Sequence, residues 1–131
     1  MRLRSAALGL ALSATLLGAC GFEKPETLIR SAKQYLAKKD YPAAWIQLQN
    51  VLKKQPENGE AHYLVATALI EFGDFAAAEK SLRRALEFGQ SPDLIRPALA
   101  KAILSQGNFK KVIAEFANPA LKERAAQAAV W

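Results

Sequence analysis

One interval recurs along this chain and constrains its fold more than any other feature. The segments KDYPAAW, GDFAAAE and GNFKKVI begin at Lys39, Gly73 and Gly107, so each starts 34 residues after the one before. An internal repeat of this length indicates one supersecondary unit used several times. Such units bury their apolar faces by stacking on one another, which favours an elongated array over a globule with one central core.

The same interval holds in four columns of packing residues. A small residue in one column predicts two antiparallel helices that approach closely, because a larger side chain would push them apart. Ala44 and Ala78 are expected to serve the partner helix in the same way. The four columns are Ala32, Ala66 and Ala100; Tyr35, Leu69 and Ile103; Tyr41, Phe75 and Phe109; and Leu48, Leu82 and Phe116.

The turn inside each unit has a recognisable chemistry. Gly73 and Gly107 stand where a first helix is expected to end, a position that favours a left-handed residue. Asp40, Asp74 and Asn108 follow as predicted N-caps of the second helix, each with an oxygen for unpaired N–H groups. The aromatic residue behind each cap is expected to anchor the turn.

A 34-residue period with a small residue in the first helix, a Gly-Asp-aromatic turn and an alanine soon after resembles the tetratricopeptide repeat (TPR). This resemblance implies an all-α fold, a TPR-like α-solenoid of antiparallel helix pairs. The array would span residues 26–131, with repeats at about 25–58, 59–92 and 93–126. The start of a further, truncated helix would follow them.

Four residues depart from the repeat pattern. Lys39 replaces the glycine of the first turn, which costs up to about 1 kcal/mol if the left-handed conformation is kept. Pro97 lies early in a first helix, so that helix either starts late or kinks. Val112 stands where the other repeats have alanine, and Pro119 falls where the second helix should still run. The third repeat is therefore predicted to be the least regular.

The first nineteen residues differ from the rest of the chain. Arg2 and Arg4 precede an uncharged run from Ser5 to Leu17, and small residues follow it. This order is typical of a secretory signal peptide, and the run is shorter than the roughly 20 residues that a transmembrane helix needs. We expect residues 1–19 to be a cleaved signal peptide.

The segment LLGAC, residues 16–20, resembles the lipobox of bacterial lipoproteins. The resemblance implies that Cys20 is lipidated and becomes the first mature residue, with residues 20–25 as the lipidated cysteine and a short linker. It places the chain in the cell envelope of a Gram-negative bacterium. Gly21, in place of the aspartate that marks inner-membrane retention, favours an outer-membrane anchor facing the periplasm. The alternative is a soluble secreted protein with a free thiol.

The side chains that carry most enzyme chemistry are scarce. The chain has one Cys and one His, so an intramolecular disulfide is excluded and the usual zinc sites, which need several such ligands, are not expected. With Cys20 lipidated, no free thiol would remain to form a nucleophilic pair with His62. His62 falls in a packing column, and Glu71 and Asp74 flank a helix end. The sequence predicts no catalytic residues, no metal ligands and no cofactor, and hence a protein that is not an enzyme.

The net charge of +6 is spread along the chain in pairs near predicted helix ends. Arg83 with Arg84 and Lys110 with Lys111 are examples. Solvated helix faces account for such pairs better than a nucleic-acid site, and export makes nucleic acid a still poorer partner. The sequence predicts no nucleic-acid binding.

In the usual geometry of the repeat, the first helix of each pair lines a concave groove. That geometry would expose Ile29, Lys33, Tyr63, Thr67 and Lys101, a mixed apolar and basic surface suited to a protein or peptide ligand with some acidic character. No asparagine stands where chaperone-binding repeats have their Lys/Asn carboxylate clamp.

The lipobox, the short spacer and the amino-acid sequence of the repeats together resemble the N-terminal part of the TPR lipoproteins of the PEP-CTERM/exosortase exopolysaccharide system. The resemblance implies a non-enzymatic, lipid-anchored scaffold for exopolysaccharide export and PEP-CTERM surface-protein sorting. Two alternatives stay open. One is a pilotin-like or outer-membrane-assembly TPR lipoprotein; the other is the binding module of an enzyme whose catalytic domain is absent from this chain.

The last residues, ALKERAAQAAVW, are helix-forming and apolar on one face. A solenoid normally finishes with a polar outer side, so this end is expected to fray or to self-associate.

Overall fold

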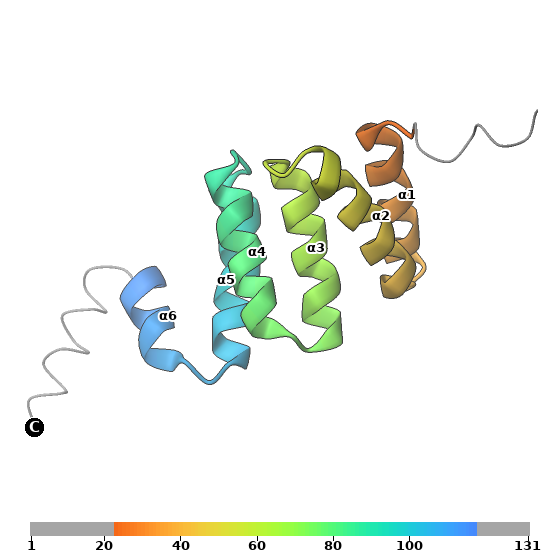
Figure 1. Ribbon diagram of the computed structural model, residues 1–131. Helices are drawn as coiled ribbons and strands as arrows, with labels where there is room; N and C mark the ends of the chain where they lie inside the picture. Colours follow the sequence, from red (N-terminus) through yellow and green to blue (C-terminus); the bar gives the residue numbers. More distant parts are fainter. Residues whose placement is uncertain (1–22, 118–131) are drawn as a thin grey trace, which may run out of the picture.

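The computed structural model describes residues 23–117, and in that part of the chain every regular element is an α-helix (Figure 1). The expected signal peptide, Cys20 and the segment 120–131 lie outside the described residues. The helices are α1 (Pro25–Ala37), α2 (Tyr41–Lys54), α3 (Gly59–Phe72), α4 (Phe75–Glu87), α5 (Pro92–Ser105) and α6 (Phe109–Phe116).

The helices pack in adjacent pairs along the chain. α1 packs on α2, α3 on α4 and α5 on α6, and successive pairs stack through contacts of α2 with α3 and of α4 with α5. Figure 1 shows the pairs in one row, with α1 and α2 at one end and α6 at the other. Each connection within a pair is two or three residues long, so paired helices run antiparallel. The expectation of an all-α, solenoid-like array of helix pairs is confirmed over these residues.

The turns inside the pairs have the predicted conformation. Gly73 and Gly107 are left-handed, with φ of 80° and 74°, and Lys39 adopts the same conformation with φ of 60°. The next residue caps the second helix in every pair. Asp40 accepts a hydrogen bond from the N–H of Ala43, Asp74 from that of Ala77 and Asn108 from that of Lys111, at N···O distances of 3.1, 3.0 and 3.3 Å.

The core follows the repeat columns in the first two pairs. Ala32, Ala66, Ala44 and Ala78 have no exposed surface, so the predicted close approach of the helices is confirmed there. Ala100 is only half-buried, because α6 has no fully buried residue and covers its partner helix less completely than α2 and α4 do.

Two further expectations are corrected in the third pair. Helix α5 begins at Pro92, ahead of Pro97, so the late start, one of the two alternatives for this helix, is excluded; Pro97 lies inside the helix, where it has no N–H to donate to the carbonyl of Asp93. Phe109 is 63% exposed and does not anchor its turn. By contrast, the equivalent Tyr41 packs edge-on against Phe72 of the following pair, with ring centroids 6.0 Å apart.

Candidate functional site

The predicted groove residues fall on equivalent positions of the first helices, α1, α3 and α5. Ile29 and Tyr63 share one column of the 34-residue repeat, and Lys33, Thr67 and Lys101 share another. Ile29 is the exception to the expected exposure. It is only 8% exposed and belongs to the hydrophobic core with Leu28, because an apolar side chain gains most from burial between helices.

An ion pair joins the first two of these helices. Lys33 Nζ on α1 lies 2.6 Å from a carboxylate oxygen of Glu60 on α3, and both side chains are about half exposed. Tyr63 is half-buried against the core, and its carbonyl accepts a hydrogen bond of 3.1 Å from the hydroxyl of Thr67. The ion pair and the hydrogen bond therefore restrict the movement of two side chains on this surface, those of Lys33 and Thr67, beside the half-buried Tyr63.

Helix α5 presents the most open part of this surface. Leu94, Pro97, Lys101 and Leu104 follow one another at helical spacing, and all four are exposed. Leu94 and Leu104 are 46% and 43% exposed, which is unusual for leucines on a packed helix. We call this stripe, with Lys33, Tyr63 and Thr67, the first-helix face.

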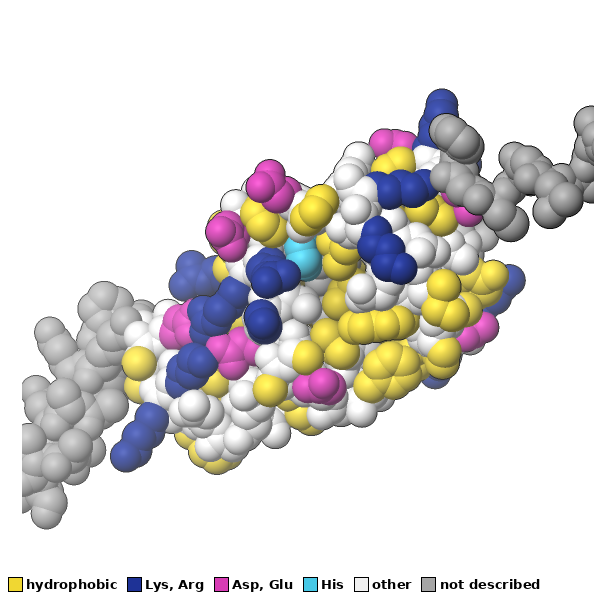
Figure 2. All heavy atoms as spheres, in the orientation of Figure 1, with side chains coloured by type: hydrophobic (Ala, Val, Ile, Leu, Met, Phe, Trp, Pro, Cys, Tyr) yellow, Lys and Arg dark blue, Asp and Glu magenta, His cyan; other side chains and the backbone are white. Residues whose placement is uncertain are grey.

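A groove opens on another side of the array, between α2 and α4. Its volume is about 370 Å³. Figure 2 shows the cyan histidine at this groove, with hydrophobic side chains and dark blue basic side chains around it. Helix α2 contributes Trp45, Gln49 and Leu52, helix α3 forms the floor with His62, Val65 and Leu69, and helix α4 contributes Ala77, Lys80, Ser81 and Arg84, with Pro56 at one end. We call this site the α2–α4 groove.

His62 has a structural role in the floor of this groove. It is 4% exposed, and its Nε2 lies 2.8 Å from the carbonyl oxygen of Pro56. Because a carbonyl only accepts, Nε2 carries the proton and donates it. The ring also lies 5.5 Å from that of Phe88, measured between centroids. The prediction that His62 packs is confirmed.

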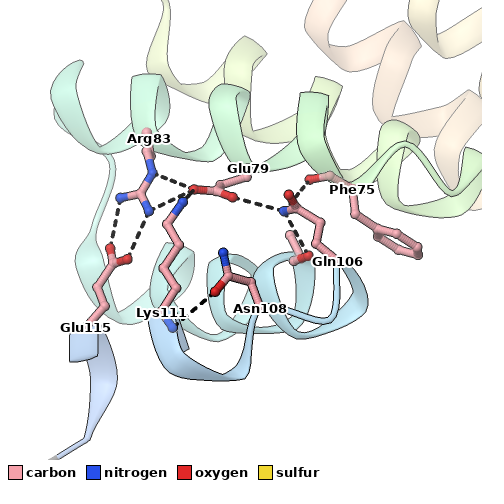
Figure 3. A network of polar contacts seen from close by, with 8 residues as sticks. Phe75, Glu79, Arg83, Gln106, Asn108, Lys111 and Glu115 are labelled. Atoms are coloured by element: carbon pink, nitrogen blue, oxygen red, sulfur yellow. Dashed lines mark hydrogen bonds and ion pairs between the residues drawn. The ribbon is translucent and has the colours of Figure 1, made fainter. Parts of the chain in front are cut away.

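A polar network ties α4 to the third pair (Figure 3). Glu79, which is 8% exposed, accepts hydrogen bonds from Arg83 on its own helix, from Gln106 at the end of α5 and from Lys111 on α6. Arg83 also donates two hydrogen bonds to Glu115, at 2.8 and 2.9 Å. Through Lys111 and Glu115 the network links α4 to α6, a helix that has no fully buried residue.

The network shifts the acidity of its carboxyl groups. Burial opposes the ionisation of Glu79, but the hydrogen bonds from Lys111, Gln106 and Arg83 together outweigh it and hold its pKa at about 2. The hydrogen bonds from Arg83 also lower the pKa of Glu115. Both groups are therefore ionised over the whole physiological range.

Sequence reasoning missed the network and the groove for the same reason. Arg83 and Arg84 look like one solvated pair, yet Arg83 faces Glu79 and Glu115 while Arg84 lines the α2–α4 groove. Each feature depends on side chains from three helices. The sequence carries one signal for the network. Glu79 and Arg83 are four residues apart, and so are Lys111 and Glu115, which is a spacing at which oppositely charged side chains meet on a helix.

Residues 23–117 hold no group of three His, Cys, Asp or Glu side chains placed to bind a metal ion. In the same range, none of the helices combines the length and the apolar character needed to cross a membrane.

Comparison with known families matches residues 35–102, just over half of the 131 residues, to the family described as Tetratricopeptide repeat. This chain belongs to the tetratricopeptide repeat family. None of the curated proteins matches it. The matched range runs from the end of α1 into α5 and so includes the left-handed turns inside the first two pairs, at Lys39 and Gly73.

Membership of the tetratricopeptide repeat family gives the fold a general role. Stacked repeats of this kind form extended surfaces that bind protein or peptide partners, and they are generally non-catalytic modules. The family thus indicates a protein–protein interaction scaffold.

Proposed function

We propose that this chain is a non-enzymatic protein-binding scaffold that is held at the periplasmic side of the outer membrane by a lipid on Cys20. The observation that supports the binding role is the exposure of residues on the first-helix face. Leu94, Pro97, Lys101 and Leu104 stand exposed on α5, in register with the half-open surface around Lys33 on α1. Apolar and basic groups together suit a partner segment with apolar and acidic residues.

The anchor is supported by the resemblance of residues 16–20 to a lipobox and by the position of α1. This helix begins at Pro25, five residues after Cys20, so the repeats would start close to the membrane surface. One acyl chain holds a protein weakly, whereas two or three bind it almost permanently, at about 0.8 kcal/mol for each buried methylene.

The cellular process is proposed from the sequence resemblance. The lipobox, the short spacer and the repeats resemble lipoproteins of the PEP-CTERM/exosortase system, so we infer a role in exopolysaccharide export and surface-protein sorting. We also infer that the α5–α6 end associates with a second copy or with a further repeat, because Leu104, Phe109 and Ile113 are all exposed there.

The binding role is tested by photo-crosslinking in the native host. A photoreactive amino acid placed at Thr67 or Lys101 should capture a defined partner, and one placed at the exposed Lys53 of α2 should not. Deleting the exosortase and polysaccharide genes should remove the captured bands if the proposed process is right. Equal capture from Lys53, or none from Thr67 and Lys101, would contradict the first-helix face as the binding surface.

The anchor is tested by comparing Cys20→Ser with the parent chain and with Ser13→Ala as a control in the signal region. The parent and the control should fractionate with the outer membrane, and Cys20→Ser should not. Mass spectrometry should find a diacylglyceryl thioether on Cys20. An unmodified thiol in the parent chain would overturn the anchor while leaving the binding role untouched.

Self-association is tested by sedimentation at rising concentration. Phe109→Ser, which removes the most exposed aromatic ring of the α5–α6 end, should shift the chain toward monomer, while Lys53→Ala should not. A parent chain that stays monomeric throughout would rule this association out.

A further inference from the structure

The α2–α4 groove is built from three helical stripes that line up. Trp45, Gln49 and Leu52 of α2 are spaced by four and three residues, as one face of a helix requires, and Ala77, Ser81 and Arg84 of α4 have the same spacing. The groove runs along α3 between them. At 1.5 Å per residue, the stripe from Trp45 to Leu52 is about 10 Å long.

We propose that this groove binds an extended segment of a protein partner that carries a large apolar side chain next to an acidic residue. The site lies between the second helices of the first two repeats, away from the first-helix face. It therefore goes beyond the proposed function and does not depend on it.

The length of the groove suits a short extended segment. The groove has a volume of about 370 Å³. An extended chain advances about 3.3 Å per residue, so about three residues match the length of the groove.

The apolar part of the lining explains the large side chain. Val65 and Leu69 of the floor belong to the buried core, and Trp45 and Leu52 pack against that core while keeping part of their surface open. This surface is held in place by helices that the core already fixes, so little ordering would be needed on binding. Tryptophan in such a setting is a frequent contributor to binding energy.

The charge of one wall explains the acidic residue. Lys80 and Arg84 are both exposed on α4, and neither forms an ion pair within the described part of the chain. Their neighbours behave differently, since Arg83 and Lys111 are committed to Glu79 and Glu115. Lys80 and Arg84 are one helical turn apart and complement a carboxylate placed beside the apolar floor.

The remaining polar groups suit a peptide backbone. Gln49 on one wall and Ser81 on the other line the groove, and neither side chain forms a hydrogen bond in the described residues. An amide and a hydroxyl can each donate to a carbonyl and accept from an N–H. An extended segment between them would find partners for its main chain.

The proposal is tested by nuclear magnetic resonance on the full chain. The isotope-labelled protein is titrated with the peptide Gly-Phe-Asp-Glu-Gly and, separately, with Gly-Phe-Asn-Gln-Gly, which has the same shape without the charges. We expect the acidic peptide to shift the Trp45 indole N–H and the amides of Leu52 and Arg84. The uncharged peptide should bind about tenfold more weakly.

Variants assign the binding to the groove. Lys80→Glu with Arg84→Glu should weaken binding of the acidic peptide about tenfold or more, and Arg84→Gln should weaken it by a smaller factor while keeping the helix intact. Lys38→Glu with Lys110→Glu, two exposed positions outside the groove and outside the first-helix face, should leave it unchanged. Circular dichroism of each variant checks that the helices are still formed.

Other outcomes overturn the proposal. Shifts confined to α1, α3 and α5 would place the peptide on the first-helix face, which would support the proposed function and not the groove. Equal binding of the two peptides, or no shift at millimolar peptide, would refute an acidic ligand. Groove resonances that move on diluting the protein alone would assign the groove to a second copy of this chain.

Discussion

At the scale of single residues, the left-handed turns show how a repeat tolerates an imperfect sequence. Each of the three turns inside the pairs has a residue at positive φ; two of them use glycine, while the first uses Lys39 with φ of 60°. A side chain in this conformation is strained by up to about 1 kcal/mol. The capping hydrogen bond of the following Asp40 is nevertheless kept, at 3.1 Å.

We therefore predict that Lys39→Gly raises the free energy of unfolding by about 0.5 to 1 kcal/mol. The reverse change, Gly73→Lys, should lower it by about 1 kcal/mol. A Cβ at Gly73 would have no atom within 4 Å, so the loss would come from the backbone conformation and not from a clash. Urea unfolding of both variants checks the pair, and a stabilising Gly73→Lys would contradict this account of the turn.

At the scale of elements, α6 is joined to the array in an unusual way. None of its residues is fully buried, and the side chains of Lys111 and Glu115 reach α4 through the network around Glu79. An apolar helix face usually supplies most of the energy that holds a helix in place. Here ionised groups supply an important share, so the attachment of α6 should respond to pH.

The pKa of Glu79 gives the direction of that response. It lies at about 2 in the folded chain against an ordinary value of 4.5, so ionised Glu79 stabilises the fold fully above about pH 4.5. This stabilisation is lost as the pH falls through that value toward 2. We expect the free energy of unfolding to fall by about 2 to 3 kcal/mol between pH 6 and pH 2.5 through this group.

Glu79→Gln isolates the effect, because glutamine keeps the shape of the side chain and cannot ionise. The variant should be less stable than the parent at pH 6 and should lose less stability on acidification. Part of the acid response should persist through Glu115, whose pKa is also lowered. Glu57→Gln, at an exposed loop position, is the matched control. A parallel pH profile for Glu79→Gln and the parent would show that the network contributes nothing.

At this scale, the sequence predicts those structural features that depend on residues close together in the chain. The caps at Asp40, Asp74 and Asn108 were predictable because each bond spans three residues. The burial of Ile29 was not, since repeat geometry alone does not say how closely the next helix covers it. The α2–α4 groove was equally out of reach, because residues from three helices must be placed before a hollow can be recognised.

At the scale of the whole molecule, the array is close to one-dimensional. Each pair contacts its neighbours, and the residues with least exposure are shared among α1, α2, α3, α4 and α5, while α6 has none. In such a structure the stability is approximately the sum of the repeats and of the interfaces between neighbours. A pair with a partner on each side is then held more firmly than one at the edge of the described array.

We predict from this a gradient of local stability that is highest in the α3–α4 pair and lowest in α6. Amides of α3 and α4 should exchange with solvent only through global unfolding, because eight residues of α3 are buried and α4 packs on both α3 and α5. Amides of α6 should exchange through a local opening of much lower free energy. Native-state hydrogen exchange measured amide by amide reports both.

A substitution in the network around Glu79 should change this gradient of local stability. If Lys111 and Glu115 hold α6 to α4, Glu79→Gln should speed exchange in α6 without changing exchange in α1, which lies at the other end of the array. Lys80→Ala, an exposed change on the same helix as Glu79, should affect neither. Uniform protection from α1 to α6, or a Glu79→Gln effect that reaches α1 equally, would mean that the described helices unfold as one cooperative unit.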